Sequence, residues 1–523
     1  MITNNWMMKI TLLYVLLSLA PIAVQAQGYE ERDARHDLTS GLTYRVEAQV
    51  SASDGRTPLW LNANKYGLSS LDQYNGYFRA SAIRPLREDS LRRWGIGYGL
   101  DLAVASHYTS KVMAQQAFVE ARWLHGALTM GSKEYPMELK NNRLSSGSQT
   151  LGINARPIPQ VRLALPDYWQ VFGLRWLGLK GHVAYGIMAD NDFQDDFTHN
   201  TSRAHNRLYH SKAGYLRIGN PYSFRPLSLE VGLEMASMFG GQIYTWRDGA
   251  YTRVEGDNSL RAFWNALVPG GSDVGENKYK NVEGDMVGAW VGRINYDAET
   301  WSWHFYGDKF FEDHSGMFQL DYNGYGEGEE WNQKKQSRYL VYELKDWMLG
   351  TEIDWHYGTW LRSIVLEYLY TKYQSGPIYH DHTENISDHI GGGDDYYNHG
   401  LYVSWQYFGQ VIGNPLYRSP IYNTDGTLTV EDNRFVAYHL GISGQPTPRL
   451  SYRLMATYQS GLGTYKKPYT HERHNVSCML EAAYSLPHGW LLTGAFGMDA
   501  GSILGHNYGL QITVAKTGWL GRK

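Results

Sequence analysis

A strict alternation of apolar and polar residues recurs in short segments along the chain and limits the folds that it can adopt. Residues 42–51 read Leu-Thr-Tyr-Arg-Val-Glu-Ala-Gln-Val-Ser, with every second residue apolar. Successive side chains of a β-strand point to opposite faces, so a period of two indicates a strand with one apolar and one polar face. The same alternation recurs in residues 94–105 and 227–238.

Charged residues stand on the polar face of these segments: Arg45 and Glu47 in the first, Asp101 in the second, Glu230 and Glu234 in the third. A half-buried strand of a soluble β-sandwich is the alternative interpretation, but charges in a dry sandwich core are costly. They suit the polar lumen of a transmembrane barrel whose apolar face meets lipid. A single sandwich also rarely takes up a chain of 523 residues.

Eighteen segments fit strands that each cross a membrane, and an even number is expected of a single-chain outer-membrane barrel. The predicted spans are 42–50, 76–84, 94–105, 111–122, 126–133, 159–166, 180–189, 207–218, 227–238, 285–296, 301–311, 346–356, 360–372, 434–444, 449–460, 475–485, 489–498 and 507–516. The sequence therefore predicts an all-β fold, a transmembrane antiparallel β-barrel of about 18 strands.

The connections between these spans alternate in length, as expected of such barrels. Short turns are predicted on the periplasmic side, and long extracellular loops are predicted at 134–158, 239–284, 312–345 and 373–433. Together the last three could cover the mouth of the barrel. Residues 167–177 form a longer periplasmic connection with two interpretations, a short periplasmic helix or a bulky turn at the membrane interface.

The chain begins with a positive residue, an apolar run and a small-residue cleavage site, the pattern of a secretory signal peptide. We predict a signal peptide at residues 1–26, a periplasmic N-terminal segment at 27–41 and the outer-membrane barrel at 42–523. The expected location is the outer membrane, with the long loops facing outside. The expected partners of such a barrel are outer-membrane lipid and the barrel-assembly machinery, and we expect a monomer.

Composition excludes some functions and leaves others open. A net charge of −4 gives no reason to expect nucleic acid, and one cysteine, Cys478, rules out an internal disulfide framework. Recognised catalytic motifs and zinc or calcium spacings are absent from the sequence, so we expect no catalytic site, metal or cofactor. Strand count alone leaves a diffusion porin open, and plentiful Ser, His and Asp leave an outer-membrane hydrolase open.

The longest interruption of the strand pattern, residues 374–433, is rich in aromatic and polar residues. Aromatic faces cover the C–H patches of sugars, while carboxylates and amides hydrogen-bond to their hydroxyls. Packing against the barrel rim is the alternative role for any one of these tyrosines. The candidate polysaccharide-binding residues are Asp394, Asp395, Tyr396, Tyr397 and Asn398 in this loop, and Tyr325, Trp331 and Trp246 in other predicted external loops.

Several fragments of the sequence, taken in order, resemble the capsule assembly protein Wzi family of Gram-negative outer membranes. The fragments are Leu59–Gly67, Leu144–Gly147, Asn154–Pro159, Phe239–Gly241, Glu312–Gly316, Glu367–Thr371, Gln374–Gly376, Asp394–His399 and Ile412–Pro415. The resemblance implies an 18-stranded barrel closed by folded external loops and periplasmic helices. It also implies a lectin-like role, in which the protein holds capsular polysaccharide, or a looser exopolysaccharide, at the cell surface.

Overall fold

The computed structural model describes most of the predicted barrel but little of the chain before it. The described residues are 37–90, 92–220, 226–268, 283–312, 323–325, 328–330, 333–336, 345–374 and 394–521. The predicted signal peptide, residues 1–26, and residues 27–36 of the predicted periplasmic segment lie outside them.

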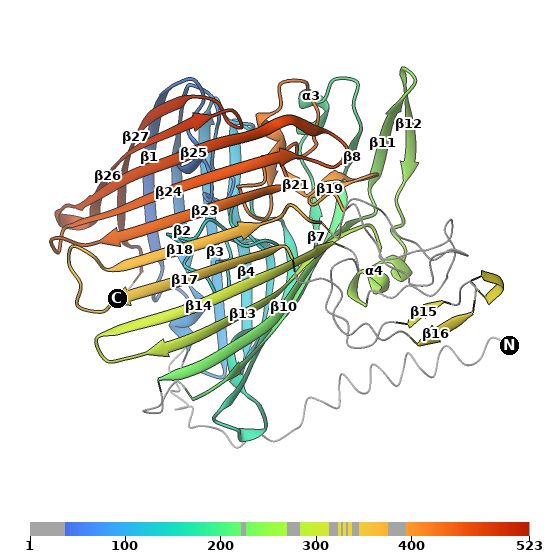
Figure 1. Ribbon diagram of the computed structural model, residues 1–523. Coiled ribbons are helices and arrows are strands. Elements are labelled where there is room, and N and C mark those ends of the chain that lie inside the picture. Colours follow the sequence, from blue (N-terminus) through green and yellow to red (C-terminus); the bar gives the residue numbers. More distant parts are fainter. Residues whose placement is uncertain are drawn as a thin grey trace.

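Eighteen antiparallel strands, paired in sequence order, close into a barrel (Figure 1). They are β1 (Thr43–Asp54), β2 (Tyr74–Arg84), β3 (Trp94–Ser106), β4 (Val112–Trp123), β5 (Gly126–Ser132), β6 (Gln160–Gln170), β7 (Leu177–Met188), β9 (Arg207–Ile218), β10 (Leu227–Phe239), β13 (Asp285–Asp297), β14 (Trp301–Glu312), β17 (Trp347–Trp355), β18 (Ser363–Tyr370), β23 (Phe435–Gly444), β24 (Leu450–Gly463), β25 (Pro468–Ser485), β26 (Trp490–Gly501) and β27 (Asn507–Trp519). Each predicted span overlaps one of these strands, so the predicted fold class is confirmed. The barrel closes where β27 pairs with β1, Thr43 opposite Trp519 and Asp54 opposite Tyr508.

The alternation in the sequence becomes the inside and the outside of this barrel. Leu100 exposes 52% of its surface on the outer face of β3, whereas its neighbour Asp101 exposes 1% and faces the lumen. Inside, Asp101 accepts hydrogen bonds from Arg79 of the adjacent strand, Nε to Oδ1 at 2.8 Å. An apolar outer face and a charged inner face are what a barrel in lipid requires. Within the part of the chain that is described, no helix is long and apolar enough to cross a membrane.

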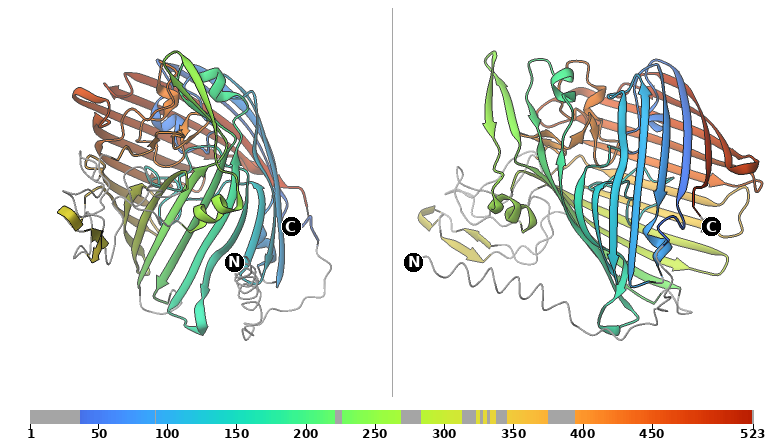
Figure 2. Two further views of the ribbon diagram at one scale, coloured as in Figure 1. Left: turned by 90° about the vertical axis from the view of Figure 1, so that its right-hand side faces the viewer. Right: turned by 180° about the vertical axis from the view of Figure 1, so that it is seen from behind.

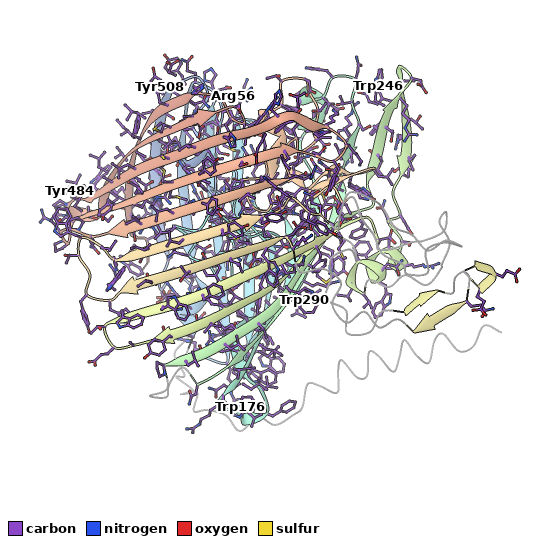
Figure 3. All side chains as sticks on the ribbon, viewed as in Figure 1. Arg56, Trp176, Trp246, Trp290, Tyr484 and Tyr508 are labelled. Atoms are coloured by element: carbon purple, nitrogen blue, oxygen red, sulfur yellow. The ribbon has the colours of Figure 1, made fainter. Side chains whose placement is uncertain are left out.

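The connections separate into two ends, which we call the short-turn end and the long-loop end. The short-turn end carries, for example, residues 298–300, 445–449 and 486–489, and the long-loop end carries residues 55–73, 133–159, 189–206, 240–268, 283–284, 371–374 and 394–434. Exposed aromatic side chains stand at the ends of the strands, as in the girdles of membrane barrels. Figure 3 labels Trp176 and Tyr484 at the short-turn end and Tyr508 at the long-loop end.

The structure decides between the two interpretations of residues 167–177 in favour of the turn. Strand β6 continues to Gln170, and only Val171–Gly173 form a single 3₁₀ turn, η2, before β7 begins. Among the described residues, the other helices at this end are also 3₁₀ turns, η1 (Leu86–Asp89) and η5 (Pro487–Gly489). The alternative of a short periplasmic helix is therefore wrong for 167–177, because β6 extends through Gln170 and only three residues of the remainder form a 3₁₀ turn.

Smaller elements gather at the long-loop end, where Figure 2 shows a hairpin that stands off the barrel. The strands are β8 (Arg203–His205), β11 (Gln242–Arg247), β12 (Ala250–Glu255), β15 (Asn323–Tyr325), β16 (Lys334–Gln336), β19 (Asn398–His399), β20 (Val403–Ser404), β21 (Gln406–Tyr407) and β22 (Gln410–Val411). The helices are α2 (Leu59–Asn62), α3 (Phe193–Phe197), α4 (Leu260–Leu267) and the 3₁₀ turns η3 (Gly328–Glu330) and η4 (Pro420–Tyr422).

Candidate functional site

Three segments of the long-loop end fold into the lumen, and we call residues 55–73, 133–159 and 394–434 together the plug. Buried apolar side chains from all three, including Trp60, Ala155 and Trp405, belong to one hydrophobic cluster. The cluster also includes wall residues such as Phe310 and Met348, so the plug and the wall share one core, the largest in the described part of the protein.

The first plug segment is attached to the wall on one side of the barrel. The backbone N–H of Leu59 donates to Oδ2 of Asp499 on β26 at 3.1 Å. The indole N–H of Trp60 donates to Oγ1 of Thr457 on β24, also at 3.1 Å. Since α2 is too short to be stable alone, these contacts with the wall hold it in place.

The second plug segment is attached to strands β14 and β18 of the wall. The ammonium of Lys140 lies 2.7 Å from the carboxylate of Asp308 on β14, and each side chain is only 1% exposed. The hydroxyl of Ser145 and the N–H of Ser146 both donate to Glu367 on β18, at 2.5 and 2.8 Å. Breaking such buried pairs is strongly destabilising, so the segment is fixed across the lumen.

The third plug segment, part of the long loop 373–433, packs between the second segment and the wall. The side-chain amide of Asn414 donates to the carbonyl of Gly147 at 3.1 Å and to the hydroxyl of Ser146 at 3.2 Å. The guanidinium of Arg207 on β9 donates to the carbonyl of Gln406 at 3.1 Å. The plug thus contacts strands on several sides of the lumen.

Tyr396 and Tyr397, predicted to offer ring faces to a sugar, are buried in this core. They expose 1% and 0% of their surfaces, and their ring centroids lie 4.6 and 5.5 Å from that of Phe310 on β14. The hydroxyl of Tyr397 donates to the carbonyl of Gln149 and accepts from the N–H of Asn414 at 3.1 Å. Both rings therefore face protein in this conformation, and a sugar would have to displace them from it.

Asp395 and Asn398 also have structural contacts. Asp395 accepts from the side-chain amides of Asn398 at 3.0 Å and Asn433 at 2.6 Å. Asn398 in turn donates to the carbonyl of Val430 and accepts from its N–H, both at 2.8 Å. Asp394 is the first residue of the third plug segment, and its backbone N–H donates to the carbonyl of Gln374 at 3.1 Å. The five predicted loop residues thus lie together, and contacts within the loop connect its two ends.

Asp432, which the sequence analysis did not identify, is a buried carboxylate of the plug. It is fully buried and accepts from the N–H of Gly463 at 3.1 Å and the side-chain amide of Gln459 at 3.2 Å. Burial raises the pKa of Asp432 to about 7, because desolvation disfavours the charged form.

The other three predicted residues are not part of this cluster. Trp246 stands on β11 of the projecting hairpin (Figure 3), and Tyr325 ends β15, which pairs with β16. Trp331 lies outside the described residues. The structure therefore separates the described members of the predicted set into the loop cluster, Trp246 on the projecting hairpin and Tyr325 on the β15–β16 pair.

The hairpin carries a second group of aromatic residues that sequence reasoning missed apart from Trp246. Tyr244 and Trp246 of β11 stand opposite Arg253 and Tyr251 of β12, so these four side chains share one face. The rings of Trp246 and Tyr251 lie 4.6 Å apart. The guanidinium of Arg203 on β8 lies 4.4 Å from the ring centroid of Tyr251. We call these five residues the aromatic–arginine face.

A sequence signal for this hairpin exists. Asp248 and Gly249 connect β11 and β12, and both have positive φ, 51° and 79°. An Asp-Gly pair between two alternating segments is a strong indication of a two-residue hairpin turn. A two-residue turn at Asp248 and Gly249 places Tyr244, Trp246 and Tyr251 on one face of the hairpin.

The part of the lumen toward the short-turn end holds a polar cavity of about 720 Å³. Ser451, Ala483 and Leu491 line it near that end, and Lys65 and Tyr66 of the plug line its inner side. Its other charged lining residues include Arg45, Glu47, Arg79, Asp101, Glu134, Arg143 and Glu481. The cavity therefore extends from the short-turn side as far as the plug.

A closed 18-stranded antiparallel barrel with an apolar exterior and a charged lumen has the fold of an outer-membrane β-barrel protein. The sequence matches no family model and no curated protein. The structure is similar to that of Wzi of Escherichia coli, described as an outer-membrane protein involved in group 1 capsule assembly and a carbohydrate-binding β-barrel. The TM-score is 0.52 with 13% identity, over 90% of this chain and 83% of that chain.

Two Pseudomonas aeruginosa structures also match over most of the chain. OccD3 (OpdP) is 9% identical with a TM-score of 0.44, over 92% of this chain and 91% of that chain. OprD is 10% identical with a TM-score of 0.42, over 91% of this chain and 94% of that chain. These two similarities assign no function.

Proposed function

We propose that the protein is a non-conducting outer-membrane barrel of the Wzi kind, which binds capsular or extracellular polysaccharide at its long-loop end and attaches it to the cell surface. In this proposal the long-loop end faces outside and the barrel acts as a monomer. The protein has no enzymatic role, and its ligand is the polymer itself.

The observation that carries the proposal is the plug. A barrel of this strand number would otherwise have a wide lumen, as the alternative function, a diffusion porin, requires. Here three segments occupy the part of the lumen toward the long-loop end, with charged pairs such as Lys140–Asp308 buried between plug and wall. The Wzi structure, similar in fold, is described as carbohydrate-binding, which supports a binding role for a barrel of this kind.

The surface that best fits a sugar is the aromatic–arginine face. Its rings offer flat apolar surfaces for sugar C–H groups, and Arg253, 53% exposed at its side chain and paired with Glu255, offers its remaining N–H donors to hydroxyls. Tyr396 and Tyr397 support this role indirectly, since their burial stabilises the plug beneath the loops. The proposal therefore moves the predicted contact from the plug to the hairpin and keeps Trp246.

The test compares cell-associated with released polysaccharide in the native host. Replacing Trp246 and Tyr251 together by Ala is expected to release most of the polymer, while surface levels of the protein stay normal. The matched control replaces Thr245 and Thr252 by Ala, because this pair stands opposite each other on the other face of the same hairpin. It is expected to retain the polymer.

Two results would overturn the proposal in distinguishable ways. Normal retention by the Trp246 and Tyr251 double variant would show that the aromatic–arginine face is not the binding surface. Large, steady single-channel currents of the intact protein in planar bilayers would favour the diffusion porin instead.

A further inference from the structure

Three side chains in the lumen bring their donor atoms together. His304 of β14 and Glu352 and Asp354 of β17 each place one ligand atom so that all three atoms lie within 4.8 Å of one another. His304 and Glu352 stand directly opposite each other in the pairing of the two strands. Each strand contributes from a rigid sheet, so the arrangement is fixed by the barrel itself.

The hydrogen bonds of Asn295 determine which nitrogen of His304 carries the proton. The oxygen of the Asn295 side chain accepts from Nε of Arg293 at 2.8 Å, and its nitrogen donates to Glu230 at 3.2 Å. The same oxygen lies 2.8 Å from Nδ1 of His304, so Nδ1 must be the donor. The lone pair of a neutral His304 is therefore on Nε2, which lies 3.8 Å from a carboxylate oxygen of Asp354.

This arrangement is that of a metal ligand held by a supporting hydrogen bond. Histidines that bind metals usually donate their other ring N–H to an oxygen, which fixes the tautomer and the ring orientation. Ligand atoms about 2.0–2.2 Å from a zinc ion are separated by about 3.4 Å in a tetrahedral site. The 3.8 Å between Nε2 and the Asp354 oxygen is close to that value.

We propose that His304, Glu352 and Asp354 bind one divalent transition-metal ion such as zinc. One imidazole and two carboxylates suit zinc and its first-row neighbours better than calcium or magnesium, which prefer oxygen ligands alone. No local motif reveals this site, because β14 and β17 are joined by a long connection. The inference is independent of polysaccharide binding.

The site is also connected to the plug. Oε1 of Glu352 accepts from the side-chain amide of Asn141, in the second plug segment, at 2.6 Å, and Oε2 accepts from Arg293. Arg293 lies 3.2 Å from Glu352 as well and offsets part of the negative charge. A bound ion would fix the Glu352 carboxylate and with it the hydrogen bond that holds residue 141.

The test titrates the purified, detergent-solubilised full-length barrel with zinc chloride and measures bound metal per chain. His304→Gln and Asp354→Asn are expected to bind one ion fewer than the wild type, or to bind that ion at least about tenfold more weakly. His182→Gln is the matched control, because His182 is also buried in the lumen but contacts the hydroxyl of Ser211. It is expected to bind like the wild type. Equal binding by His304→Gln and the wild type would overturn the proposal.

A second measurement needs no variant and so does not depend on folding of the substituted chains. X-ray absorption at the zinc edge, on wild-type barrel loaded with one equivalent, should show one imidazole among oxygen ligands. A spectrum with no imidazole, or with two or more, would also overturn the proposal.

Discussion

Tyr397 provides the sharpest test of the structure, because its two possible roles predict opposite results for one substitution. Its ring is fully buried, and its hydroxyl bridges the carbonyl of Gln149 and the N–H of Asn414. If the ring face binds sugar, Tyr397→Phe keeps the ring and should behave like the wild type. If Tyr397 holds the plug, Phe leaves two buried backbone groups without their partner.

The expected magnitudes follow from these contacts. Each unsatisfied buried group costs about 1–3 kcal/mol, so the loss of partners for two groups should destabilise the third plug segment by at least about 2 kcal/mol. Ala also removes the ring from its contacts with Phe310 and Tyr417, whose centroids lie 5.5 and 4.2 Å away. Removing a buried aromatic ring costs about 3–5 kcal/mol.

Limited trypsin digestion of the purified barrel measures this destabilisation. Arg418 is the only Arg or Lys in residues 394–433, and its guanidinium is hydrogen-bonded to Glu431 and to the carbonyl of Tyr422. Cleavage there requires local opening of the plug. Since each 1.4 kcal/mol is a factor of ten, Phe should speed cleavage by at least about 30-fold and Ala by more than about 100-fold.

The control is Tyr251→Ala on the projecting hairpin, which should leave cleavage at Arg418 unchanged. Wild-type resistance of the Phe variant would refute the hydrogen-bonding argument. Resistance of the Ala variant as well would show that Tyr397 does not hold the plug.

Three further predictions concern the wall and the plug. Leu100→Arg, on the lipid-facing side of β3, should cost about 2–4 kcal/mol in refolding experiments, and Leu100→Phe less than about 1.5 kcal/mol; equal costs would contradict a lipid-facing position. Gly413→Ala would place a methyl group against the Tyr397 hydroxyl and should speed cleavage at Arg418, whereas Gly400→Ala, with open space around it, should not. Burial raises the pKa of Asp432 to about 7, so its contribution to stability is present below about pH 4 and is lost as pH rises through 7. Asp432→Asn should therefore reduce the drop in melting temperature between pH 5 and pH 8. An unchanged drop would show that Asp432 does not cause it.

The strands could be predicted from the sequence because their signal is local. Leu100 and Asp101 are adjacent, and their opposite polarity is enough to assign one face to lipid and one to the lumen. Repetition of that pattern eighteen times then determined the barrel, since strands joined by short turns pair with their neighbours. At 167–177 the sequence left a short helix and a turn open, because the apolar residues there have no regular period.

The interior could not be predicted, because its contacts join residues far apart in the chain. Ser145 meets Glu367, and Leu59 meets Asp499, and no periodicity in either segment indicates such a partner. An aromatic residue in a loop can equally bind a ligand or fill a core, so the composition around Tyr397 did not decide its role. The buried position of that ring, like the grouping of His304 with Glu352 and Asp354, exists only once the barrel has closed and brought distant strands around one lumen.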